Sequence, residues 1–210
     1  MIVAVDGPAA AGKGTIARRL ADRFGYAYLD TGALYRAVAL SLLRAGADPA
    51  DPEAAARTAR NLHLPDTADP GIRTPEVGLA ASVVAAIPRV RATLLDLQRN
   101  FARRPPDGRP GAVLDGRDIG TVICPGADRK IFVTATPEVR ARRRHLELLG
   151  RGEHSIYSSV LADLRERDAR DANRVDAPLR RSRDAMVLDT SFITADEAFR
   201  RACAFVESAQ

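Results

Sequence analysis

The chain has 210 residues, of which 46% are hydrophobic and 28% are charged, as in an ordinary globular protein. This length suits one α/β domain with its own core, and no apolar run approaches the roughly 20 residues that a membrane helix requires. Of the 32 basic residues only Lys13 and Lys130 are lysines, and the net charge is +5. Since basic and acidic residues interleave and aromatic residues make up 5%, the composition argues against a stacking surface for nucleic acid.

Strands and helices alternate along the sequence. Strand-like runs occur at about 2–6, 26–29, 112–115, 130–134 and 186–189, and helical periodicity near 13–24, 32–45, 75–86, 88–104, 137–149, 155–170 and 194–208. This alternation predicts βαβ units and a parallel sheet flanked by helices. Two segments rich in proline and glycine, 64–71 and 105–110, are predicted to be loops.

The first motif, GPAAAGKGT at 7–15, follows the first strand and precedes a helix. Glycines let backbone N–H groups turn toward phosphate oxygens, and Lys13 adds a charge at the β/γ position, which together predict a P-loop. Gly14 follows the lysine, so the hydroxyl of Thr15 comes one place later than in the common pattern. The simpler interpretation, a turn rich in glycine and alanine, does not account for the lysine and its spacing. As a surface lysine, Lys13 is expected to contribute little to stability.

The second motif, LDTGALYR at 29–36, places Asp30 at the end of a strand and Thr31 where it can cap the next helix. Tyr35 and Arg36 are adjacent and can converge on one ligand.

The third motif, Asp115-Gly116-Arg117-Asp118, ends the third strand, where ligands gather in parallel sheets. A β-turn with a surface ion pair is the alternative interpretation of this third motif.

The fourth feature is the arginine-dense region from Arg140 to Arg174. On a helix Arg167, Arg170, Asp171 and Arg174 would form one charged stripe, part of which intrahelical ion pairs explain. Phosphoryl transfer needs positive charge over the transferred group and a cover that excludes water. Two arginine-rich helices around a tip containing Gly150 and Gly152 would suit such a lid.

These motifs, together with IRTPEV at 72–77 and ASVVAAIPRVR at 81–91, LDGRDIGTV at 114–122 and RDARDANR at 167–174, resemble bacterial cytidylate kinases over nearly the whole chain. The resemblance implies a P-loop kinase fold of the α/β class: a five-stranded parallel sheet flanked by helices, a helical monophosphate-binding region and an arginine-rich lid. It implies one domain at 1–210, with the core at about 1–30, 111–136 and 184–210, the monophosphate-binding region at about 31–104 and the lid at about 142–174. Many members of the family carry a β-rich insertion before the segment matching 72–74, where this chain has only the loop 64–71.

The resemblance also implies roles for individual residues. The ATP phosphates would be held by Gly7, Pro8, Ala9, Ala10, Ala11, Gly12, Lys13, Gly14 and Thr15. The CMP phosphate and its surroundings would be contacted by Thr31, Tyr35, Arg36 and Arg117, the cytosine edge by Ser82, Arg91 and Asp118, and the sugar and phosphates from the lid side by Arg167, Asp171 and Arg174. Lys13, Arg117, Arg167 and Arg174 would be catalytic. Mg²⁺ would have no direct protein ligand that we can assign, with Thr15 and Asp115 as candidates for contact through water.

The expected reaction is transfer of the ATP γ-phosphoryl group to CMP or dCMP, with ATP and Mg as cofactors. An adenylate or shikimate kinase on the same fold, a P-loop nucleotide switch and an arginine-rich RNA-binding module are the alternatives. We expect small-molecule partners alone, with no nucleic acid and no membrane, and a monomer. The first strand begins at residue 2 and there are two cysteines, so a signal peptide and a disulfide framework are not expected and the predicted location is the cytoplasm.

Overall fold

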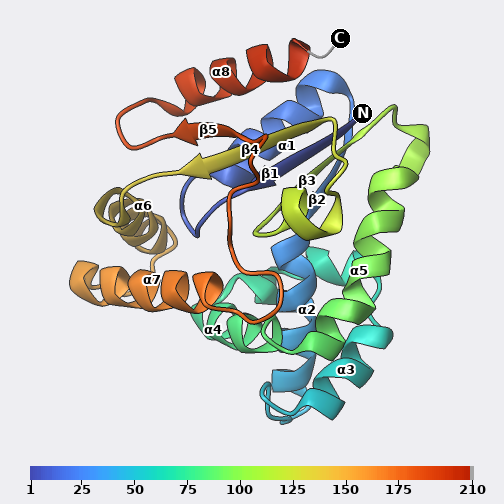
Figure 1. Ribbon diagram of the computed structural model, residues 1–210. Coiled ribbons are helices and arrows are strands. Elements are labelled where there is room, and N and C mark those ends of the chain that lie inside the picture. Colours follow the sequence, from blue (N-terminus) through green and yellow to red (C-terminus); the bar gives the residue numbers. More distant parts are fainter. Residues whose placement is uncertain (209–210) are drawn as a thin grey trace. The chain divides into compact units, whose positions relative to one another are not determined.

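The computed structural model describes residues 1–208, apart from the side chains of residues 65 and 66. The chain divides into two compact units. The first, called the sheet unit, comprises Met1–Leu29 with Pro105–Gln210, and the second, called the helical unit, comprises Asp30–Arg104. Figure 1 shows the elements of both.

A five-stranded parallel sheet forms the centre of the sheet unit, in the order β2-β3-β1-β4-β5. The strands are β1 (Ile2–Asp6), β2 (Ala27–Asp30), β3 (Ala112–Gly116), β4 (Arg129–Thr134) and β5 (Met186–Asp189). β1 lies between β3 and β4, with Val3 opposite Val113 on one side and Arg129 on the other. The five predicted strands and the α/β class are therefore confirmed.

Helices α1 (Lys13–Phe24) and α8 (Ala195–Glu207) cover one face of this sheet. Side chains two apart on a strand point to the same face, so Val3 and Val5 of β1 pack against Ile16 and Leu20 of α1 in a single core cluster. The intervening residues Ala4 and Asp6 are also buried. A central strand buried on both faces is what the parallel arrangement requires.

The remaining helices of the sheet unit are α6 (Pro137–Gly150) and α7 (Tyr157–Ala172), which pack against each other. A π-helical turn, Ile119–Ile123, follows β3, and a 3-10 turn, Pro106–Gly108, precedes it. α7 ends at Ala172, so Arg174 lies beyond the helix and the predicted stripe of four residues on one helix is wrong at its last member.

The helical unit contains α2 (Thr31–Arg44), α3 (Pro52–Arg60), α4 (Pro75–Val84) and α5 (Pro88–Arg103). α2 packs on α4 and α3 packs on α5. The segment predicted as a loop at 64–71 folds into 3-10 turns, Leu64–Ala68 and Pro70–Arg73. Helix α3 was not predicted, although Asp51 caps it and Pro52 occupies its first position.

Candidate active site

The loop 7–12 leaves β1 in a conformation that only certain residues allow. A Cβ on Gly7, whose φ is 146°, would lie 1.9 Å from the carbonyl oxygen of Val133 in β4. Ala10 at φ 58° and Gly12 at φ 93° are left-handed, whereas Ala11 between them is not. Alternation of left- and right-handed residues turns successive N–H groups toward one side and forms an anion-binding nest.

Helix α1 begins at Lys13, directly after this loop. The first N–H groups and the positive end of the dipole of this helix therefore lie where they can bind the same anion as the nest. Gly14, the departure from the common pattern, lies next to the third strand: a Cβ there would be 3.1 Å from Oδ2 of Asp115. Glycine at this position makes room for that carboxylate. The hydroxyl-bearing Thr15 is exposed.

Lys13 is buried, with 7% of its surface exposed. Its Nζ donates to the carbonyl oxygen of Pro8 at 3.3 Å and lies 3.6 Å from Oδ1 of Asp115. The expectation that Lys13 is a surface residue is therefore wrong, and the argument that it contributes little to stability loses its basis. A buried ion pair becomes costly when one partner is removed, because the other charge stays behind.

Asp115, the residue before the last one of β3, has a buried carboxylate, which accepts a hydrogen bond from the hydroxyl of Tyr28 at 3.3 Å. Among residues 1–208, no group of three or more His, Cys, Asp or Glu side chains could hold a metal ion. Mg²⁺ in phosphotransferases does not need such a group, because it takes phosphate oxygens, water and one or two carboxylates. A carboxylate beside the P-loop lysine fits a hydrated Mg²⁺ on the nucleotide.

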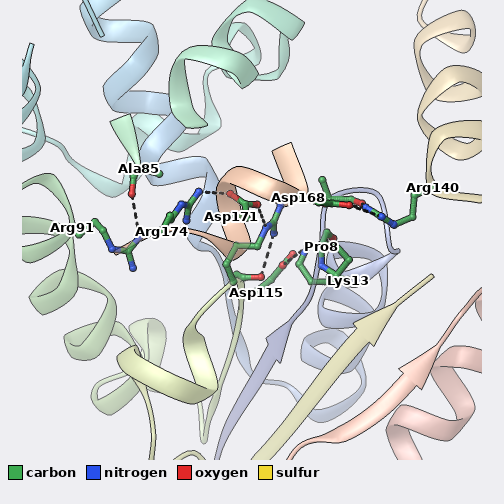
Figure 2. A network of polar contacts seen from close by, with 12 residues as sticks. Pro8, Lys13, Ala85, Arg91, Asp115, Arg140, Asp168, Asp171 and Arg174 are labelled. Atoms are coloured by element: carbon green, nitrogen blue, oxygen red, sulfur yellow. Dashed lines mark hydrogen bonds and ion pairs between the residues drawn. The ribbon is translucent and has the colours of Figure 1, made fainter. Parts of the chain in front are cut away.

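Two residues beyond Asp115, Arg117 leads into a cluster of arginines around Asp171 of α7. Nε of Arg117 donates to Oδ2 of Asp171 at 3.0 Å, and Nη2 of Arg174 donates to its Oδ1. Burial alone would raise the pKa of Asp171, but the charges of Arg117, Arg174 and Arg167 outweigh it and hold that pKa below its usual value. Figure 2 shows Asp171 beside Arg174. The partner of Arg117, Asp171, is only 1% exposed and Asp118 of the same motif is 5% exposed, so the alternative of a surface ion pair in this motif is wrong.

Asp118 is also buried. The π-helical turn that follows it is held by Asp6, the last residue of β1, whose Oδ1 and Oδ2 accept from the N–H groups of Ile119 (2.8 Å) and Gly120 (2.7 Å). Burial raises the pKa of Asp6 to about 6 in spite of these two bonds. Sequence reasoning missed this role of Asp6, because the two bonds join positions more than 110 residues apart.

In the helical unit, α2 carries the second motif. Asp30, and not Thr31, is the N-cap: its side chain accepts from the N–H of Ala33 at 3.1 Å, while Thr31 is the buried first residue of the helix. Nη1 of Arg36 lies 3.4 Å from Oδ2 of Asp30. The expectation that Thr31 caps the helix is therefore wrong by one residue.

Tyr35 lies next to Arg91 of α5, which the sequence alone could not establish. The Arg91 guanidinium carbon is 5.9 Å from the centroid of the Tyr35 ring, and Nη1 donates to the carbonyl oxygen of Ala85 at 3.3 Å. Figure 2 shows the bond to Ala85. Both contacts restrict the orientation of the Arg91 guanidinium.

Ser82 of α4 is 4% exposed, and its Oγ has no hydrogen-bond partner among the described residues. A buried hydroxyl without a partner is uncommon and calls for an explanation such as a ligand. Of the residues assigned to the cytosine edge, Ser82 is thus the one whose hydrogen-bonding capacity the described protein leaves unused.

Within residues 1–208 no single helix is long and apolar enough to cross a membrane. The consecutive helices Pro75–Val84 and Pro88–Gly108 reach the necessary length and hydropathy only when they are counted together, and the chain bends by 99° between them.

A glycine-lined loop with a left-handed turn, a lysine at the start of the following helix and a parallel sheet behind it define a P-loop nucleotide-binding protein. The sequence matches the family model for cytidylate kinase over residues 3–208. Cytidylate kinase of Methylocella silvestris is 59% identical over 209 residues, covering 100% of this chain and 95% of that protein. Cytidylate kinase of Paramagnetospirillum magneticum is 59% identical over 207 residues, with 99% and 98% covered. The chain belongs to the cytidylate kinase family.

Solved structures support the fold. A gluconokinase from Sinorhizobium meliloti superposes with a TM-score of 0.52 at 18% identity, covering 99% of this chain and 91% of that one. An uncharacterized protein from Eubacterium ventriosum gives 0.58 at 13% identity, with 99% of each chain covered. At these identities the likeness is one of fold.

Proposed function

We propose that the protein transfers the γ-phosphoryl group of ATP to the phosphate of CMP or dCMP. The observation that carries this proposal is the end of strand β3. Asp115 there contacts the P-loop lysine, and Arg117, two residues on, joins the arginine cluster at Asp171. One strand end thus connects a triphosphate-binding loop with guanidinium groups suited to a second anion. Full-length relatives named cytidylate kinase support cytosine as the base.

The acceptor is already an anionic phosphate oxygen, so no general base is needed and catalysis consists of alignment and charge neutralisation. The N–H groups of residues 7–15 and Lys13 would hold the ATP phosphates. Arg117, Arg167 and Arg174 would stabilise the charge that spreads over the transferred group. Because Asp171 already orients Arg117 and Arg174, these donors need little reorganisation during the reaction.

Mg²⁺, when bound with ATP, would supply further positive charge that neutralises the donor phosphates. Asp115 would orient its water shell, since its carboxylate lies beside both Lys13 and Gly14. The hydroxyl of Thr15, an exposed residue, is the other candidate.

In the helical unit Thr31, Tyr35 and Arg36 would contact the CMP phosphate, and Ser82 and Arg91 the base. In the sheet unit, Asp118 is the residue that the family resemblance assigns to the base. A base site of this kind discriminates through hydrogen bonds, because uracil or adenine would leave buried polar groups without partners. The orphan Oγ of Ser82 supports this role.

An acceptor panel tests the proposal. The purified chain is assayed for ADP release from ATP with CMP, dCMP, UMP, AMP and shikimate, and we expect CMP and dCMP to give the highest kcat/KM. The variant K13M, purified in the same way, controls for contaminating kinases. Faster turnover with AMP or shikimate, or ADP release that no acceptor stimulates, would contradict the proposal.

A further inference from the structure

Two carbonyl oxygens of the P-loop accept hydrogen bonds from side chains that are distant in sequence but belong to the same sheet unit. The carbonyl oxygens of Ala9 and Ala11 lie on either side of the left-handed Ala10. Nη1 of Arg140 donates to the first at 3.3 Å. Oγ1 of Thr190 lies 3.0 Å from the second and 3.1 Å from the carbonyl oxygen of Thr134, so its one proton is shared between these two acceptors. A left-handed alanine is sterically unfavourable, so contacts from outside the loop must maintain it.

Arg140 is held in place from two further directions. It is 3% exposed; its Nε donates to the carbonyl oxygen of Ala135 at 3.0 Å. Nη1 and Nη2 form a bidentate pair with Asp168 of α7, at 3.1 and 2.6 Å, as Figure 2 shows. A bidentate pair fixes the plane of the guanidinium, so the donor that reaches Ala9 has a defined direction.

Thr190 is oriented in a similar way by Arg143, three residues after Arg140 on α6. Nη1 of Arg143 donates to Thr190 Oγ1 at 2.9 Å, and Nη2 donates to its carbonyl oxygen at 2.6 Å. Residues three apart lie on the same face of a helix. One face of α6 therefore reaches both P-loop carbonyls, once directly and once through Thr190.

The geometry of the peptide bond gives these contacts a consequence for binding. In a trans peptide the C=O and the following N–H point in opposite directions. Holding the oxygen of Ala9 toward Arg140 directs the N–H of Ala10 away from Arg140, and holding the oxygen of Ala11 toward Thr190 directs the N–H of Gly12 away from Thr190. These N–H groups belong to the loop that receives phosphate.

We infer that Arg140 is a positioning residue for ATP: by binding the carbonyl of Ala9 it orients the N–H groups of the P-loop before the nucleotide arrives. The inference rests on ATP as the P-loop ligand, as proposed above. Apolar packing between Ala9 and helices α6 and α7 is already supplied by a buried cluster that includes Ala141, Leu148 and Leu164. Packing alone does not orient a peptide group, whereas the hydrogen bond from the Arg140 guanidinium fixes the orientation of the Ala9 carbonyl.

Nucleotide affinity in the absence of CMP tests this role. The probe is the β,γ-imido analogue of ATP with Mg²⁺, titrated by calorimetry. In R140K the charge opposite Asp168 remains, but one ammonium group cannot serve Ala9, Ala135 and Asp168 together, and we expect the Kd to rise at least tenfold. T190V removes the hydroxyl that binds Ala11 without removing a charge, and a rise of about fivefold is expected.

The matched control is R165K. Arg165 also joins α7 to α6, through Glu138 at 3.0 Å, but both side chains are exposed and neither contacts the P-loop. Its Kd should stay within twofold of the wild-type value. A folded R140K protein with a lowered Tm and an unchanged Kd would overturn the inference, and if R140K does not fold, an unchanged Kd in T190V would overturn it. Wild-type protein that binds the analogue but does not phosphorylate CMP would refute the proposed acceptor alone.

Discussion

Lys13 links catalysis and stability in one side chain. It is expected to neutralise the transferred phosphoryl group, and it also lies opposite the buried carboxylate of Asp115. K13M should therefore lower kcat by about 10³-fold and also lower the free energy of unfolding by about 3 kcal/mol, because a buried charge loses its partner.

The double variant K13M/D115N separates the two effects. Removing the carboxylate as well should restore most of the stability, measured by urea unfolding, without restoring kcat. A K13M protein with near-normal turnover would contradict the catalytic role, and one with wild-type stability would contradict the importance of the ion pair.

Ser82 gives a second prediction at this scale. Because its buried Oγ has no partner among the described residues, S82A should leave the Tm unchanged or raise it slightly, since no hydrogen bond is broken. The KM for CMP should rise about tenfold while the KM for ATP stays within twofold. A lowered Tm with an unchanged KM for CMP would show that the hydroxyl serves the fold instead.

At the scale of elements, Asp171 connects helix α7 to the residues that follow β3. Its pKa is lowered in the folded protein, chiefly because the Arg117 charge overcomes the effect of burial. A carboxylate with a lowered folded pKa stabilises the protein above its unfolded pKa of about 3.9, and this contribution is lost as the pH falls through the folded pKa.

The difference in unfolding free energy between wild type and D171N should thus be largest near pH 7 and should shrink toward pH 3. Urea unfolding of both proteins at several pH values measures it. A difference that is independent of pH would show that Asp171 contributes through its shape and not through its charge.

Local signals predicted the elements well where side chains differ in polarity. The five strands follow from apolar runs, and the P-loop from the spacing of glycines and lysine. Helix α3 was missed although its pattern is amphipathic, because it has only 9 residues and its buried side chains are all alanines, Ala54, Ala55, Ala56 and Ala59. The sequence signal that could have predicted the start of this helix is its cap, Asp51 followed by Pro52.

The contacts that complete the site were beyond sequence reasoning for a different reason. Arg140 and Ala9 are 131 positions apart, and Thr190 and Ala11 are 179 apart. With 32 basic residues, all but two of them arginine, no composition or spacing distinguishes Arg140 from an arginine on the surface. Only the folded chain identifies it.

At the scale of the whole molecule, the proposed reaction requires donor and acceptor to be bound together. A bisubstrate analogue in which adenosine and cytidine are joined through five phosphates should bind at least 100-fold more tightly than ATP alone, because joining the ligands removes the entropic cost of the second association. The extra affinity should also raise the Tm further than saturating ATP does.

Differential scanning fluorimetry and calorimetry measure both quantities, with the matching diadenosine compound as the control for base choice. Equal affinity for the two compounds would contradict a cytosine site. Affinity no better than that of ATP would contradict simultaneous binding.

The scarcity of lysine has a practical consequence. Both ammonium side chains are almost inaccessible, at 7% exposure for Lys13 and for Lys130, so an acylating reagent would label the amino terminus of the native protein first. Slow labelling at position 13, followed by mass spectrometry, would then report nucleotide occupancy without any mutation, because a bound triphosphate would shield that single amine.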